Sequence, residues 1–132
     1  LKEVPTGIGL SYGHTFHTTH PSLIATVPIG YGDGLSRRLS NNLALVVGGR
    51  RCPQVGQICM DQSLVDVTAL RGRVKVGDEV VIVGQQGQAA VTVDELADKL
   101  GAINYEVVVT IATRVPRIAI RPSHVSTLGA DV

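Results

Sequence analysis

Hydrophobic and polar residues alternate in short runs along most of this chain, and glycines separate one run from the next. In residues 64–68, Val65 and Val67 share one phase and the remaining three residues share the other. A period of two predicts a β-strand with one buried face. Similar short apolar runs predict further strands over residues 23–29, 43–47, 51–55, 79–84 and 118–120.

Glycines mark the expected turns between these strands. Gly48-Gly49 fits a two-residue hairpin turn, because glycine readily adopts the positive φ that such a turn needs. Gly77-Asp78 predicts another turn, and residues 85–88 predict a second hairpin tip. Many short strands joined in this way indicate a mostly β fold, an antiparallel barrel or sandwich.

One helix is predicted clearly. Thr92 and Glu95 match a capping box, and Gly101 marks the expected end of the helix. The residues between them carry one apolar stripe, made of Val93, Leu96, Ala97 and Leu100. We assign this helix a structural role.

The C-terminal part allows two interpretations. Residues 107–113 are rich in β-branched side chains, which favours a strand, but a short helix beginning after Asn104 is also possible. From Arg121 onward the chain is polar, and we expect this tail to be frayed.

Length and composition indicate one domain, residues 1–132. The charged fraction is 17%, low for a fully solvated surface, so we expect a partner to cover part of it. The net charge of +1 and the 3% of aromatic residues give no support for binding to nucleic acid or to an anionic membrane. No apolar run approaches the ~20 residues of a membrane helix. Because the first residue is Leu1, we expect the chain to be cut from a longer protein.

Neither the cysteines nor the histidines form a pattern that predicts a disulfide bond or a metal site. We interpret Cys52 and Cys59 as reduced thiols of a cytoplasmic protein. His14, His17 and His20 recur every three residues, but threonines and Pro21 disfavour the helix that would gather them. No further ligand follows at a typical spacing, so we expect no metal site.

The most distinctive stretch is residues 27–34, in which Tyr31 and Asp33 stand between three glycines. An apolar run leads into it, so we expect a strand that delivers a tight loop. Tyrosine can donate or accept a proton, and Tyr12 and Tyr105 also lie in unusual local contexts. On chemistry alone, each tyrosine could equally be a packing or interface residue.

Several familiar chemistries are missing. The glycines are not followed by the lysine and hydroxyl residue of a phosphate-binding loop, and no serine nucleophile elbow occurs. The three lysines, Lys2, Lys75 and Lys99, lie outside any pocket-like motif, so we do not expect a Schiff-base lysine in this chain.

Five segments together resemble the C-terminal domain of alanine racemase, in the order of that family and over nearly the whole chain. They are residues 11–16 (Ser-Tyr-Gly-x-Thr-Phe), residues 27–34, residues 55–62, Ile103-Asn104-Tyr105-Glu106 and Arg114-Val115-Pro116-Arg117. The resemblance implies a mostly β domain, a partly open Greek-key-like antiparallel barrel with one or two short helices.

The resemblance also implies a function and its partners. The family is a pyridoxal-phosphate isomerase that interconverts L- and D-alanine, with an N-terminal α/β barrel that this chain lacks. A lysine of that barrel binds the cofactor covalently. Two subunits form a head-to-tail homodimer, in which each active site lies between one barrel and the C-terminal domain of the other subunit. The fragment alone is then expected to be inactive.

Roles of individual residues follow from the resemblance. Tyr12 would be one of two catalytic acid/bases, the cofactor lysine being the other. The remaining positions are Tyr105 on the cofactor phosphate, Met60 with its backbone N–H on the substrate carboxylate, Tyr31 at the narrow part of the substrate entrance, and Arg37 and Asp61 further out.

The chain departs from the family in two places. Gly32 replaces an alanine common between the tyrosine and the aspartate, and Gln57 stands where a basic residue is frequent. The alternative function is a non-catalytic β-barrel module for binding or interaction on the same scaffold.

Overall fold

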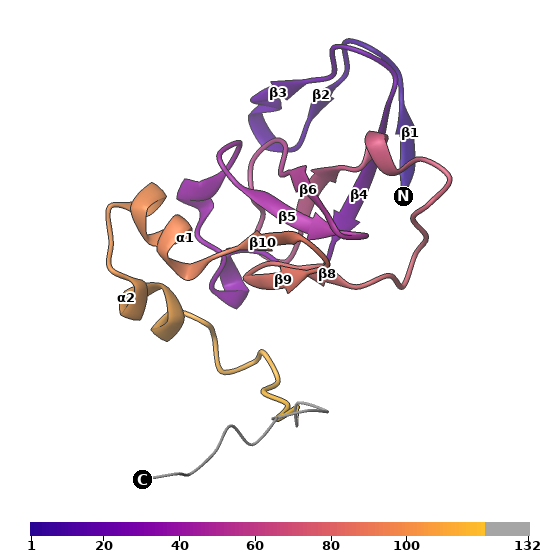
Figure 1. Cartoon of the computed structure of the whole chain (residues 1–132). Helices are drawn as coiled ribbons and strands as arrows, with labels where there is room; N and C mark the ends of the chain where they lie inside the picture. Colours follow the sequence, from indigo (N-terminus) through magenta and orange to yellow (C-terminus); the bar gives the residue numbers. More distant parts are fainter. Residues whose placement is uncertain (121–132) are drawn as a thin grey trace, which may run out of the picture.

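The computed structural model describes residues 1–120, in which short antiparallel strands predominate (Figure 1). The strands are β1 (Lys2–Val4), β2 (Gly9–Leu10), β3 (Phe16–His17), β4 (Ser22–Val27), β5 (Ala44–Val47), β6 (Arg50–Pro53), β7 (Ser63–Asp66), β8 (Val80–Val81), β9 (Gly84–Gln86) and β10 (Ala89–Val91). The α-helices are α1 (Val93–Leu100) and α2 (Asn104–Val109), and the short 3-10 helices are η1 (Tyr12–His14), η2 (Tyr31–Asp33), η3 (Arg37–Leu39) and η4 (Thr68–Leu70).

The strands form four small sheets, and every strand pair is antiparallel. One sheet has the order β1-β4-β7, a second has the order β6-β5-β8, and β2-β3 and β10-β9 form two-stranded ribbons. The prediction of a mostly β, antiparallel domain with two short helices is confirmed. Within the described residues these sheets do not join into one closed barrel.

The predicted hairpins are present. Val47 pairs with Arg50 across Gly48 and Gly49, which have φ values of 55° and 72°. Positive φ at both turn residues matches the twist of a two-residue hairpin and is costly for residues other than glycine. The second hairpin joins β9 to β10 by pairing Gln86 with Ala89.

The core lies between the two three-stranded sheets and the helical side of the domain. Val65 and Val67 are fully buried, whereas Leu64 and Asp66, which precede them in turn, are only partly buried, as the period of two predicts. Burial of each such aliphatic side chain contributes roughly 1.5–3 kcal/mol. The other buried members of this main cluster are Leu23, Val27, Leu35, Leu39, Leu43, Leu45, Val46, Val47, Cys52, Ile58, Leu70, Val91 and Leu96.

Helix α1 begins and ends where the sequence predicts. The Thr92 hydroxyl accepts a hydrogen bond from the Glu95 N–H at 3.1 Å, and Gly101 ends the helix with a φ of 64°. The Glu95 carboxylate does not complete the capping box. It accepts hydrogen bonds from Arg51 at 2.6 Å and from Lys99 at 2.9 Å, and mainly the bond from Arg51 lowers the pKa of Glu95 to about 2.

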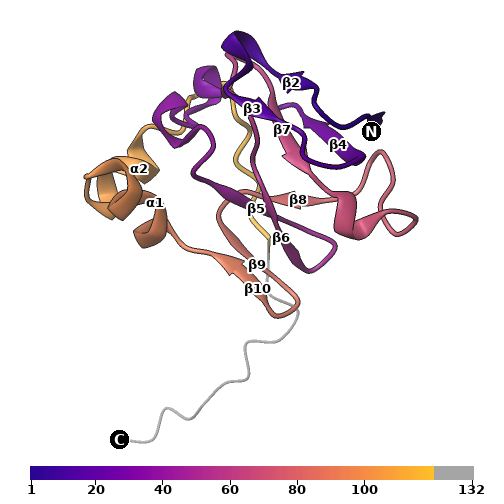
Figure 2. The same cartoon turned by 90° about the horizontal axis from the view of Figure 1, so that it is seen from above.

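Helices α1 and α2 lie side by side at the end of the domain away from the N-terminus, in both views (Figures 1 and 2). The longer of them has eight residues, and no helix among residues 1–120 is long and apolar enough to cross a membrane.

Three strand predictions were wrong in whole or in part. Residues 104–109 form α2, the alternative that the sequence left open, because α2 packs on α1 with Val107 against the core. Residues 118–120 form no strand, and the side chains of Ile118 and Ile120 are exposed. Residues 79–84 do not form one continuous strand: Val80–Val81 form β8, residues 82 and 83 bend, and Gly84 already begins β9, where it pairs with Val91.

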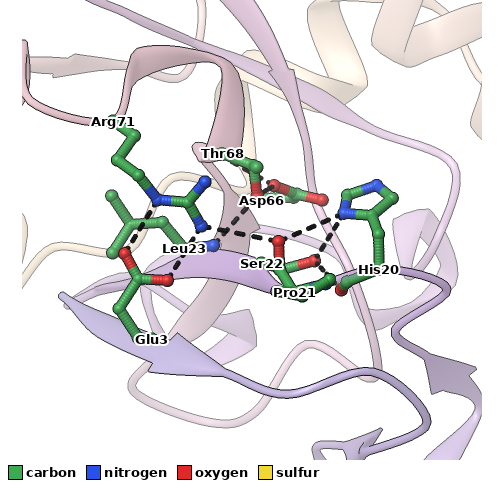
Figure 3. A network of polar contacts seen from close by, with 8 residues as sticks. All are labelled: Glu3, His20, Pro21, Ser22, Leu23, Asp66, Thr68 and Arg71. Atoms are coloured by element: carbon green, nitrogen blue, oxygen red, sulfur yellow. Dashed lines mark hydrogen bonds and ion pairs between the residues drawn. The ribbon is translucent and has the colours of Figure 1, made fainter.

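Polar contacts connect the N-terminal strand to the turn after β7 (Figure 3). Both ends of the Arg71 guanidinium donate to Glu3, at 2.9 and 2.8 Å, and the Thr68 hydroxyl accepts from the Leu23 N–H at 2.9 Å. Ser22 lies next to His20, but its hydroxyl is buried and donates to the His20 carbonyl oxygen at 2.8 Å. This network stabilises the fold and offers no accessible nucleophile.

Candidate functional site

The loop after β4 is hydrogen-bonded to the segment that carries Met60. The Tyr31 N–H donates to the Cys59 carbonyl oxygen at 3.0 Å, and the Gly32 N–H donates to the Met60 carbonyl oxygen at 2.9 Å. A Cβ at Gly30 would overlap the Cys59 carbonyl oxygen and lie 2.5 Å from that of Met60. Only glycine allows this close approach, which places Tyr31 beside Met60.

The same loop contacts the end of α2 on its other side. Gly34 has a φ of 108°, and a Cβ there would lie 2.5 Å from the Thr110 carbonyl oxygen. The Ala112 N–H donates to the Asp33 carbonyl oxygen at 3.0 Å. The glycine loop therefore lies between the Met60 segment and the helix that carries Tyr105.

Asp33 holds the loop in its bent form. One of its carboxylate oxygens accepts from the Gly30 N–H at 2.9 Å, and the other accepts from Arg114 Nε at 2.8 Å. The Gly30 bond first, and then Arg114, lower the pKa of Asp33 below its ordinary value. Arg114 also donates from a terminal nitrogen, Nη2, to Asp61 at 2.8 Å.

Tyr12 lies in η1, which closes the β2–β3 ribbon. The preceding residue, Ser11, has a φ of 61°, and its hydroxyl donates to the Gln57 carbonyl oxygen at 2.7 Å. A Cβ at Gly56 would lie 2.8 Å from the Ser11 Cβ. The turn that carries Tyr12 is thus packed on the segment that leads to Met60, in a backbone conformation that costs free energy for a serine.

Arg37 is connected to the same segment through its backbone. Its carbonyl oxygen accepts from the Ser40 hydroxyl at 2.6 Å, and that hydroxyl accepts from the Ile58 N–H at 2.9 Å. Residues 56–61 therefore form a central segment that contacts the turns of Tyr12, Tyr31 and Arg37.

The side chains of the predicted site residues are exposed. The exposed fractions are 75% for Tyr12, 48% for Tyr31, 53% for Met60 and 79% for Tyr105. Large side chains with so much accessible surface are common at sites of interaction with another molecule or domain. A pocket between the Tyr31 loop and α2 is lined by Tyr31, Arg38 and Glu106.

The structure brings Tyr31, Met60 and Asp61 together through direct contacts of their segments. Tyr12 and Arg37 are joined to them through the backbone contacts of residues 56–61, whereas α2 with Tyr105 is joined through the glycine loop. Sequence reasoning missed Arg114 as a possible site residue. Its motif contributed only to the resemblance, and no local pattern indicates that it meets residues 53 and 81 positions away.

The histidines and cysteines take no part in this arrangement as a metal or disulfide site. His14 and His17 meet edge to face, with ring centroids 6.3 Å apart. Among residues 1–120, no group of three or more His, Cys, Asp or Glu side chains is placed to hold a metal ion. Both cysteines are free thiols, and burial raises the pKa of Cys52.

Comparison with known families gives a match over residues 1–119 to the alanine racemase C-terminal domain. Alanine racemase 2 of Caldanaerobacter subterraneus subsp. tengcongensis is 54% identical over 120 residues, which cover 91% of this chain and 31% of that protein. The alanine racemase of Clostridium novyi is 44% identical over 95% of this chain and 32% of its own length. The chain thus spans about one third of the length of these curated relatives.

Solved structures agree with the sequence comparison. The alanine racemase from Bacillus anthracis with bound L-Ala-P superposes with a TM-score of 0.84 at 42% identity, covering 91% of this chain and 30% of that one. The enzyme from E. faecalis gives a TM-score of 0.82 at 40% identity, covering 88% of this chain and 30% of that one.

Proposed function

Because the chain belongs to the alanine racemase C-terminal domain family, we propose that it is the C-terminal part of an enzyme that interconverts L- and D-alanine. The observation that carries the proposal is the joined set of exposed side chains around residues 56–61, which presents Tyr12, Tyr31 and Met60 outward. The proposed partners are an N-terminal barrel of the same protein and a second, identical subunit, in the cytoplasm. Such partners would cover side chains that are exposed in this domain.

The proposed cofactor is pyridoxal phosphate, bound by a lysine outside this chain. Lys99 forms an ion pair with Glu95, and Lys2 belongs to β1, which pairs with β4 at Ile24. Lys75 precedes an exposed turn. Since none of these lysines belongs to the site segments, the chain can contribute to the cofactor site only through other groups. Tyr105, exposed on α2, suits the donation of a hydrogen bond to a phosphate oxygen.

Met60 is proposed to bind the substrate carboxylate through its N–H. The Cys59 carbonyl oxygen and the Met60 N–H belong to one peptide group, in which they point in opposite directions. Because the Tyr31 N–H holds that carbonyl oxygen, it also fixes the direction of the Met60 N–H. The Met60 N–H makes no hydrogen bond to any of residues 1–120, so it is available to an incoming anion.

Tyr12 is proposed to move the α-proton on one face of the substrate. Its phenol oxygen is proposed to accept the proton from one enantiomer and return it when the other enantiomer reacts, while a base outside this chain serves the opposite face. The bound cofactor would withdraw electron density from the α-carbon and so ease proton removal. A tyrosine that acts as a base needs a cationic neighbour, and we assign that neighbour to the missing domain.

The test is Tyr12→Phe in the complete enzyme. We expect turnover to fall by roughly 10²-fold or more, because the variant lacks the group that exchanges the proton. Cofactor absorbance should be unchanged, since Phe keeps the ring and its packing. Near-normal turnover by the variant would refute the role of Tyr12, and a wild-type enzyme that racemises no amino acid would refute the proposed function itself.

A further inference from the structure

The Arg114 guanidinium joins two carboxylates that lie far apart in the sequence. Its Nε donates to Asp33 at 2.8 Å, and one terminal nitrogen donates to Asp61, also at 2.8 Å. Asp33 is mostly buried, with 16% of its side chain exposed, whereas Asp61 is 69% exposed. Planar guanidinium groups suit such directed pairs, because their donors point in fixed directions.

The guanidinium also packs closely on the glycine loop. A Cβ at Gly32 would lie 3.1 Å from Arg114 Cζ, nearer still to its terminal nitrogen, and 3.0 Å from the Met60 carbonyl oxygen. Arg114 and the Met60 carbonyl group therefore approach Gly32 from neighbouring directions. Arg114 is seated where the two loops meet.

Arg114 contacts the residue that follows Met60 and also the glycine loop that is hydrogen-bonded to the Met60 segment. Asp61 directly follows Met60, and Asp33 closes the loop whose Tyr31 and Gly32 N–H groups hold the Cys59 and Met60 carbonyl oxygens. An ion pair that fixes Asp61 relative to Asp33 therefore limits rotation of the intervening peptide groups. Two carboxylates more than balance the single positive charge of Arg114, so its effect on a substrate is geometric rather than that of a free cation.

We propose that Arg114 is a positioning residue, which holds the Met60 N–H in the direction required to bind the substrate carboxylate. The inference rests on the proposed function, since it concerns the same substrate. According to the proposal, Arg114 affects how tightly the site binds substrates and inhibitors that carry a carboxylate. In this role Arg114 acts through the Met60 peptide group and not by direct contact with the substrate.

The experiment compares Arg114→Gln with the wild type in the complete, cofactor-loaded enzyme. Two quantities are measured: the KM for L-alanine, and the inhibition constant of propionate, which has the carboxylate and methyl group of alanine but no amine. We expect both to rise about tenfold or more for R114Q, with a change in kcat of less than about threefold, as for a lost charge-assisted hydrogen bond.

Arg71→Gln is the matched control. Arg71 also makes a charge-paired contact at the surface and has a similar exposed fraction, 47% against 46% for Arg114, but it lies in the network of Figure 3. We expect R71Q to leave the KM and the propionate constant unchanged. Arg114→Lys keeps the charge but cannot span both carboxylates in the same way, so it should give intermediate values. Asp61→Asn combined with R114Q should be no worse than R114Q alone, because both remove the same contact.

The outcomes separate the two proposals. If the wild type racemises alanine and R114Q lowers only the thermal midpoint, with both constants unchanged, the positioning role is refuted and the proposed function stands. Equal increases in R114Q and R71Q would also refute it, since they would reflect a general loss of stability. A wild type without racemase activity would refute the proposed function and with it the inference.

Discussion

Two exposed arginine–carboxylate contacts in this domain have similar chemistry but different structural roles. Arg71 donates from Nε and from one terminal nitrogen to the two oxygens of the single Glu3 carboxylate and so connects β1 to the turn after η4. Arg114 divides its donors between Asp33 and Asp61, which lie on two loops outside the strands. The first contact joins elements that strand pairing already holds, whereas the second orients peptide groups that lack such support. A pair of this kind matters more for the geometry that it fixes than for its own strength.

The largest loss of local stability is expected from a substitution where the glycine loop contacts the Met60 segment. Gly30→Ala should disrupt the site, because the new Cβ would collide with the Cys59 and Met60 carbonyl groups, which cannot move aside as a flexible side chain can. We expect the amides of residues 27–35 and 56–62 to lose at least ~3 kcal/mol of protection against hydrogen exchange in the complete protein.

The matched control for that variant is Gly72→Ala, beside Arg71. Gly72 also has a positive φ, 77°, but a Cβ there would meet nothing within 4 Å. Its cost should be the backbone strain alone, about 1–2 kcal/mol, and confined to the turn after η4. Equal effects of the two substitutions would contradict the close packing at Gly30.

A smaller effect is expected from pH at Glu95, which belongs to neither region. Its pKa in the folded protein is lowered to about 2 by Arg51 and Lys99, below the ~4.3 of an unpaired glutamate. A lowered folded-state pKa contributes stability above the unfolded value, and this contribution is lost as pH falls toward 2. The thermal midpoint of the complete protein should therefore fall between pH 5 and pH 3, and less steeply in Glu95→Gln. Parallel pH profiles for the two proteins would show that the contacts of Glu95 add nothing.

The smallest effect is expected from breaking the Arg71 contact. Its partners are 47% and 61% exposed, and pairs of this kind contribute about 0–1 kcal/mol. Arg71→Ala should lower the thermal midpoint by no more than a few degrees. This difference from the wild type should shrink as added salt screens the ion pair that only the wild type has. A large loss of stability would contradict this prediction and would show that the fold depends on the Arg71 contact.

Local sequence patterns were sufficient for the parts of the fold that depend on local physics. The period of two placed β7, the glycine pair placed the β5–β6 turn, and Thr92 and Gly101 placed the ends of α1. The β-branched run after Asn104 favoured a strand, yet packing against α1 made it helical. Intrinsic strand preference is weaker than such tertiary contacts.

The site could be predicted only in part for a similar reason. The resemblance named residues one at a time, and the structure joins several of them through residues 56–61. The contacts of Arg114 with Asp33 and Asp61 leave no trace in periodicity or composition, because they form only when three distant segments fold together. The close approaches at Gly30 and Gly32 likewise depend on a partner segment that no local pattern identifies.

The most direct test of the account is to follow solvent deuterium incorporation at the α-carbon of L-alanine and of D-alanine separately. The complete enzyme and its Tyr12→Phe variant would be measured in heavy water, each with cofactor bound. The account predicts that the wild type labels both enantiomers, and that the variant loses the exchange of one enantiomer while it retains that of the other. Labelling of both enantiomers by the variant at wild-type rates would contradict the assignment of Tyr12 as the acid/base on one face.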